Sequence, residues 1–168
     1  MNINESQQRG EKPRILVLCG YNLERSVMLA NELSDSLKNK ANVESRGLYK
    51  PIKKIGSPNS ENFLGLFHQD KFSTGVSMHH ATPVTQQEIN NAHLILVHTL
   101  SQKNKVLTIA PESKNRVFLV KEMLEDGHDL KKGNLDIRSY GSDEGHMRHS
   151  VDAVTSGILE NVKKFLSI

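Results

Sequence analysis

The sequence predicts a single α/β domain, an open and mainly parallel four-stranded sheet with helices on both faces. Segments with the composition of strands occur near residues 15–19, 43–46, 94–98 and 116–121. Helical patterns of apolar residues occur near residues 26–39, 60–69, 85–91, 101–109 and 146–166. Strands that alternate with helices favour a parallel sheet covered on both sides, and a length of 168 residues suits one domain.

Residues 1–13 are polar and are expected to form a flexible N-terminal tail, so the domain spans residues 14–168. The aliphatic run from Ile15 to Leu18 is typical of a strand buried on both faces. From Ser26 onward apolar residues recur as they do on one side of a helix. The stretch from Pro51 to Ser60 is rich in loop-forming residues and is expected to flank the pocket.

The only cysteine, Cys19, ends the first predicted strand, and Arg25 and Ser26 follow six and seven residues later. A thiol at this junction lies at a helix N-terminus, where free N–H groups and the helix dipole stabilise anions. A guanidinium beside it grips two phosphate oxygens at once. A lone cysteine after a strand is usually only a small buried hydrophobe, but this combination of residues predicts a phosphate-binding loop with a cysteine nucleophile.

Ligands of open parallel sheets bind beyond the carboxyl ends of the strands. Cys19, Ser45 and His98 all fall near such ends. We therefore expect the functional site at this edge of the sheet.

The spacing of Cys19, five residues, Arg25 and Ser26 resembles that of the low-molecular-weight protein tyrosine phosphatases. The resemblance extends over most of residues 14–168. The segments that carry it, in order, are Asn42–Gly47, Gly56–Pro58, His79–Thr85, Ala92–Val97 and Arg116–Glu122.

The resemblance implies hydrolysis of phosphotyrosine in a protein substrate through a cysteinyl-phosphate, without a cofactor or a metal. Cys19 would attack phosphorus, and Arg25 would hold the phosphate. The substrate-binding residues implied are the rest of the loop and an aromatic wall, namely Gly20, Tyr21, Asn22, Leu23, Glu24, Ser26 and Tyr140. Ser26 would also donate to the thiolate, although a helix cap is an alternative role for it, and Ser45 and His79 would support the loop with Asn22.

Two loop residues depart from the family. Tyr21 stands where the family has glycine, so its ring must point away or reshape the rim of the pocket. Glu24 replaces a neutral residue, and its carboxylate should weaken phosphate binding or favour cationic groups in the substrate.

The general acid of the family is an aspartate in an Asp-Pro-Tyr/Phe-Gly segment, and this chain has Asp136 and Tyr140-Gly141 in that region. Alignment on Tyr140 puts Arg138 in the place of the aspartate, whereas alignment on Asp136 requires two extra residues. We favour Asp136 as the acid because a guanidinium does not release its proton. Pairing of Asp136 with Arg138 is the structural alternative, and Asp143 and Glu144 are weaker candidates.

Several other classes of function fit less well. Arsenate reductases that share this loop need further cysteines, and phosphotransferase IIB domains do not need Arg25. A phosphate- or phosphotyrosine-binding module with impaired catalysis stays open. The net charge of +3 is too small for a nucleic-acid platform, and the eight histidines lack the spacing of metal ligands.

A single cysteine and the lack of a signal sequence or a long apolar segment predict a cytoplasmic protein that does not contact membranes. The sequence gives no oligomeric state.

Overall fold

A computed structural model describes residues 10–22, 25–49, 81–124 and 144–168, the last range as backbone alone up to residue 150. The sheet has four strands in the order β2-β1-β3-β4, and every neighbouring pair is parallel. The strands are β1 (Arg14–Cys19), β2 (Asn42–Gly47), β3 (Leu94–Val97) and β4 (Val117–Leu119). The predicted fold class, an open parallel four-stranded sheet, is therefore confirmed.

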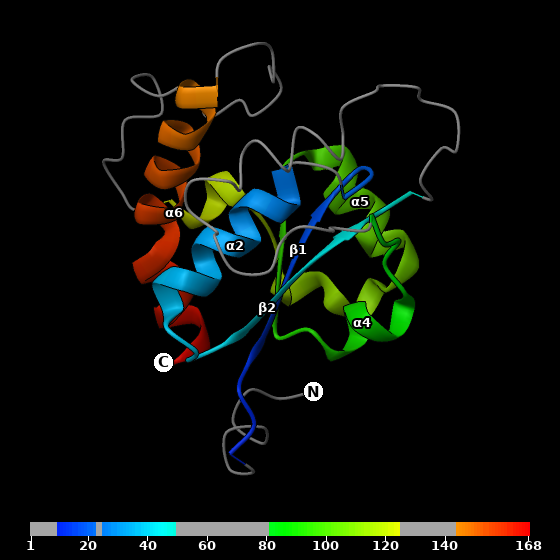
Figure 1. Cartoon of the computed structure of the whole chain (residues 1–168). Helices are drawn as coiled ribbons and strands as arrows, with labels where there is room; N and C mark the ends of the chain where they lie inside the picture. Colours follow the sequence, from blue (N-terminus) through cyan, green and yellow to red (C-terminus); the bar gives the residue numbers. More distant parts are fainter. Residues whose placement is uncertain (1–9, 23–24, 50–80, 125–143) are drawn as a thin grey trace.

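Helices cover the sheet on both sides (Figure 1). One side carries α2 (Arg25–Leu37) and α6 (Glu144–Leu166), and the other carries α4 (Gln86–Asn91) and α5 (Leu100–Ile109). Each side has its own hydrophobic core because side chains alternate along a strand. In β1, Ile15 and Val17 belong to the cluster under α2 and α6, whereas Leu16 and Leu18 belong to the cluster under α4.

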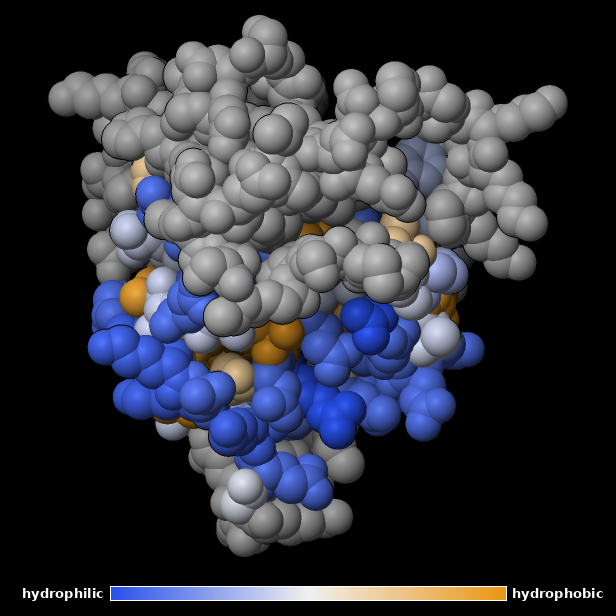
Figure 2. All heavy atoms as spheres, viewed as in Figure 1, coloured by the Kyte–Doolittle hydropathy of each residue, from blue (hydrophilic) through white to orange (hydrophobic). Residues whose placement is uncertain are grey.

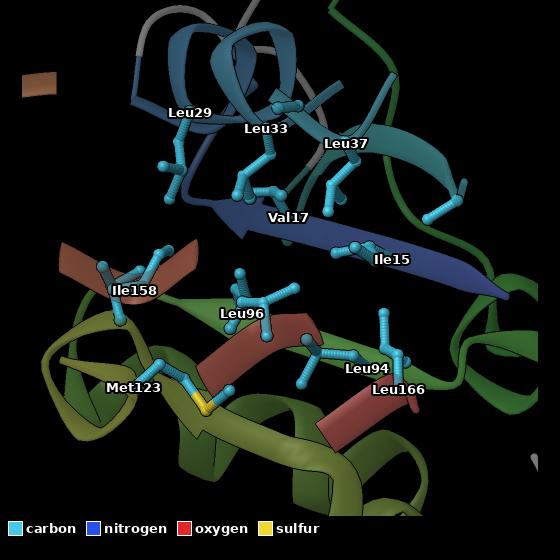
Figure 3. Close-up of a cluster of buried hydrophobic side chains, with 14 of the residues drawn as sticks. Ile15, Val17, Leu29, Leu33, Leu37, Leu94, Leu96, Met123, Ile158 and Leu166 are labelled. Atoms are coloured by element: carbon cyan, nitrogen blue, oxygen red, sulfur yellow. The ribbon is translucent and has the colours of Figure 1, made fainter. Parts of the chain in front are cut away.

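The core under α2 and α6 is the larger of the two clusters. Leu29, Leu33 and Leu37 of α2 point toward β1, and Ile158 and Leu166 lie on α6 on the other side of the same cluster (Figure 3). All five are at most 1% exposed. This burial fixes α2 against β1, so the start of α2 is held close to the end of the strand that carries Cys19. Hydrophilic residues cover most of the coloured surface in Figure 2.

Two of the helices begin with reciprocal capping boxes. Thr85 caps α4 with Glu88 as its partner, and Thr99 caps α5 with Gln102. In each box the threonine hydroxyl accepts from the backbone N–H of the third helical residue, and the side chain of that residue accepts from the threonine N–H. These bonds fix where each helix starts relative to the sheet edge.

The fourth strand is shorter than the predicted 116–121. It ends at Leu119, and Val120–Met123 form a 3-10 helix (η2) in which the Glu122 carboxylate accepts from the Leu119 N–H at 2.7 Å. The apolar run continues past the strand because Val120 and Met123 pack into the core under α6, not because the strand continues.

A second 3-10 helix, η1 (Pro111–Arg116), precedes β4 and was not expected. The helix predicted at 60–69 and the loop at 51–60 lie outside the described residues. Within the described ranges, no helix has the length and apolarity needed to cross a bilayer.

Candidate functional site

The candidate site is the loop between β1 and α2, at the carboxyl edge of the sheet. Cys19 ends β1 and is 4% exposed. The Leu48 N–H donates to the Cys19 carbonyl at 2.9 Å, and the Tyr49 N–H donates to the Gly20 carbonyl at 2.9 Å. The chain after β2 therefore continues the parallel pairing and holds the first half of the loop.

The Cys19 thiol lies among polar groups. The Asn22 N–H donates to Sγ at 3.2 Å, and the Ser26 Oγ lies 3.1 Å from Sγ. Ser26 is the second residue of α2 and is fully buried, so its place is not that of an N-cap. The sulfur therefore has an N–H donor and a hydroxyl within hydrogen-bonding distance, beside the N-terminus of a helix.

Asn22 joins the loop to two other segments. Its Nδ2 donates to the Ser26 Oγ at 3.1 Å and to the Ser45 Oγ at 2.9 Å, and its Oδ1 accepts from the Thr82 N–H at 3.1 Å. The residue is fully buried with a φ of 57°. Asparagine adopts this left-handed conformation more readily than most residues, so Asn22 suits both the turn and the hydrogen bonds.

Gly47 makes room for the loop. A Cβ on this residue would lie 2.9 Å from the Tyr21 carbonyl carbon and 3.1 Å from the Asn22 nitrogen. The Gly47 N–H also donates to the Thr82 carbonyl at 2.8 Å, and the Val84 N–H donates to the Gly47 carbonyl at 2.7 Å. Gly47 is thus packed between the loop and the segment that precedes α4.

An ion pair fixes that segment from the other side. The Arg46 Nε donates to the Glu88 carboxylate at 2.7 Å, and the same carboxylate caps α4 through Thr85. The end of β2 and the start of α4 are therefore tied together. This positions the Thr82 N–H against Asn22.

Arg25 is the first residue of α2 and is partly buried. No hydrogen bond or ion pair joins its guanidinium to another described residue. Its positive charge acts on His98, which follows β3. Burial, and secondly the Arg25 charge, lower the pKa of His98 to about 3. The imidazole is therefore neutral at ordinary pH, and the cation beside the loop is Arg25.

Two tyrosines form an aromatic rim beside the loop. The rings of Tyr21 and Tyr49 lie with their centroids 5.6 Å apart at 46°, and both are partly exposed. The Tyr21 side chain thus lies against Tyr49 at the surface, and its backbone stays in the loop.

The structure brings together Cys19, Gly20, Tyr21, Asn22, Arg25, Ser26 and Ser45 from the residues that the sequence singled out. The other five lie outside the described residues: Leu23, Glu24, His79, Asp136 and Tyr140. Their places in the site stay predictions. Among the described residues, no three His, Cys, Asp or Glu side chains are grouped as metal ligands.

The sequence did not assign a role in the site to Thr82 or Gly47, and it placed His98 at the site's edge without a partner. Thr82 contributes only its backbone, which carries no sequence signal. Gly47 ends a strand beside the loop, and its signal was a glycine within a strand pattern. His98 was placed at a strand end, but its proximity to Arg25 depends on the order of the strands.

Neither a protein-family model nor a curated protein sequence matches the chain. Solved structures do. The YwlE arginine phosphatase from Geobacillus stearothermophilus is 22% identical with a TM-score of 0.65, covering 92% of this chain and 93% of that one. The low-molecular-weight protein tyrosine phosphatase of T. tengcongensis is 20% identical with a TM-score of 0.64, covering 91% and 99%.

A low-molecular-weight phosphotyrosine phosphatase of Vibrio cholerae, VcLMWPTP-2, is 24% identical with a TM-score of 0.62, covering 91% of this chain and 96% of that one. The chain therefore has the fold of these phosphatases. The likeness extends over nearly the full length of each.

Proposed function

We propose that the chain is a metal-independent phosphatase that hydrolyses aryl phosphate monoesters of the phosphotyrosine type through a cysteinyl-phosphate. One observation carries the proposal. The Cys19 Sγ, at the N-terminus of α2, lies 3.2 Å from the Asn22 nitrogen and 3.1 Å from the Ser26 Oγ. Arg25 begins the same helix.

In the first step the Cys19 thiolate attacks phosphorus, so that an S–P bond forms and the bond to the leaving oxygen breaks. Arg25 and the free N–H groups at the start of α2 stabilise the charge on the phosphoryl oxygens. The leaving phenolate takes a proton from a carboxylic acid, for which Asp136 is our candidate.

In the second step water attacks phosphorus and the S–P bond breaks. The deprotonated acid takes a proton from that water, inorganic phosphate leaves, and the thiolate is restored. The Asn22 N–H and the Ser26 hydroxyl favour this step because they stabilise sulfur as the departing anion.

The aromatic rim supports an aryl substrate. Tyr21 and Tyr49 are partly exposed beside the loop, where a phenyl ring bound through its phosphate could pack against them. Vibrio vulnificus Wzb, which has the same fold, was solved with benzylphosphonate, in which one methylene group joins a phenyl ring to a phosphonate. Since YwlE is an arginine phosphatase, phosphoarginine is the second substrate to test.

The experiment measures release of phosphate from p-nitrophenyl phosphate, a phosphotyrosine peptide and a phosphoarginine peptide, each with a chelator present. We expect hydrolysis of the two aryl esters. Cys19→Ser should lower kcat by more than about 10³-fold but still bind inorganic phosphate, because the anion is held mainly by N–H groups and Arg25.

The serine variant has a second readout. A cysteine-to-serine variant of YwlE carries phosphate on its active-site serine, and mass spectrometry of Cys19→Ser after incubation with substrate would reveal the same adduct. Hydrolysis at the wild-type rate by Cys19→Ser would refute the assignment of Cys19 as the nucleophile. Phosphate binding by the wild-type chain without turnover would identify a binding module instead.

A further inference from the structure

His98 lies beside the nucleophile although it is 79 residues away in sequence. The last register pair of β1 and β3 joins Leu18 to Val97, so Cys19 and His98 follow at the same level of the sheet edge. Leu18 and Val97 both point into the core under α4 and α5. Because side chains alternate along a strand, Cys19 and His98 both turn toward the side of α2.

The backbone of His98 is fixed by the start of α5. Its N–H donates to the Gln102 Oε1 at 2.9 Å, and Gln102 also belongs to the capping box with Thr99. The imidazole is thus presented from a rigid position. A side chain held in this way can orient a flexible neighbour.

The ring has an unused hydrogen-bonding atom. The residue is partly exposed, but its Nε2 is buried and has no hydrogen-bond partner. A buried polar atom without a partner destabilises the folded state, and such atoms in native proteins call for an explanation.

Arg25 offers the matching group. Its guanidinium has five N–H donors, of which a phosphate takes two. Its charge acts on the His98 ring, yet no hydrogen bond joins it to another residue in the described ranges. A donor fork at the start of α2 and an unpaired acceptor nitrogen at the end of β3 thus occur at the same edge of the sheet, on the side of Cys19.

We propose that His98 is a positioning residue for Arg25, whose guanidinium donates to the unprotonated Nε2 and is thereby held with its other N–H groups toward the phosphate. The inference rests on the proposed function of the loop. A neutral acceptor suits this task, because it fixes the direction of the guanidinium without cancelling its charge. A carboxylate in the same place would attract the guanidinium but oppose the phosphate.

The test is a double-mutant cycle on the full-length chain, read by calorimetry with inorganic phosphate and by kcat and KM for p-nitrophenyl phosphate. His98→Leu should weaken phosphate binding and lower kcat/KM on the order of tenfold, the usual worth of a hydrogen bond to a charged group. His98→Gln should recover most of the loss, since its amide oxygen can accept in place of Nε2.

The cycle is closed with Arg25→Lys, which keeps the charge and lacks the fork. On this background His98→Leu should change phosphate affinity by less than about twofold. His93→Asn is the matched control at the opposite end of β3, where the His93 Nδ1 accepts from the Arg14 N–H at 3.0 Å. It should leave phosphate affinity unchanged, and thermal unfolding of each variant shows that it is folded.

Equal effects of His98→Leu on the wild-type and Arg25→Lys backgrounds would overturn the inference while leaving the proposed function intact. Nitrogen-15 NMR of His98 tests it without any activity, because the proposal requires the proton on Nδ1. A protonated Nε2 would also overturn it. A wild-type chain that neither binds phosphate nor turns over would refute the proposed function and the inference together.

Discussion

Asn22 offers the most demanding test of the loop geometry. Its side chain makes hydrogen bonds to three described groups, the hydroxyls of Ser26 and Ser45 and the Thr82 N–H, at 2.9 to 3.1 Å. It is fully buried with a φ of 57°. Asn22→Ala removes all three bonds and keeps the unfavourable φ, whereas Asn22→Gly removes the bonds and relieves the φ.

The expected magnitudes follow from these contacts. Three hydrogen bonds at about 1 kcal/mol each give a loss of about 3 kcal/mol for Asn22→Gly. Asn22→Ala should cost about 1–2 kcal/mol more, because a Cβ disfavours the left-handed conformation. A domain of this size is stable by about 5–15 kcal/mol, so Asn22→Gly should still fold, and the total loss of about 4–5 kcal/mol leaves Asn22→Ala folded except at the lower end of that range.

The assay is urea unfolding of the full chain together with phosphate binding. Asn22→Asp keeps an acceptor for the Thr82 N–H but places a carboxylate near the anion. Its loss in the free energy of phosphate binding should therefore exceed its loss in the free energy of unfolding. Asn104→Ala, on the exposed side of α5, is the control and should change stability by less than about 0.5 kcal/mol. Losses below about 1 kcal/mol for both Asn22→Ala and Asn22→Gly would refute the idea that this network holds the loop.

Three further predictions concern other parts of the site. Gly47→Ala should destabilise the fold by about 1–3 kcal/mol and weaken phosphate binding, because its Cβ would meet the Tyr21 carbonyl carbon at 2.9 Å; unchanged binding would show that the loop adapts freely. Asp136→Asn should slow hydrolysis of an aryl phosphate with a poor leaving group by about 10²–10⁴-fold, and it should slow hydrolysis of one with a good leaving group less. Asp35→Asn, at an exposed position, is the control. Equal, small effects on the two substrates would assign the role of general acid to another carboxylate. The low pKa of His98 means that, between pH of about 6.5 and about 3, its unfolded form binds a proton that the folded form does not. Stability should therefore fall as pH falls through this window, by up to about 1.4 kcal/mol per pH unit more in the wild type than in His98→Gln; identical pH dependence of unfolding would contradict an imidazole that stays neutral in the folded state.

The sequence by itself determined the local parts of the molecule. The aliphatic run ending at Cys19 formed the predicted strand, and the helix after it begins at Arg25, one residue before the predicted start. Such features are readable because strand and helix periodicity, caps and turn residues depend on neighbours in the chain. The predicted end of β4 was wrong by two residues, because apolar residues in a 3-10 turn and in a strand look alike in sequence.

Only the tertiary structure decided which distant residues meet at the loop. Asn22 and the Thr82 N–H are 60 residues apart, and a backbone donor carries no residue-type signal. Tyr49 lies against Tyr21, and His98 lies near Arg25, because β2 and β3 flank β1 in the sheet. The physical reason is that strand order is set by how crossover helices bury their apolar faces, so the contacts at the carboxyl edge follow from packing over the whole domain.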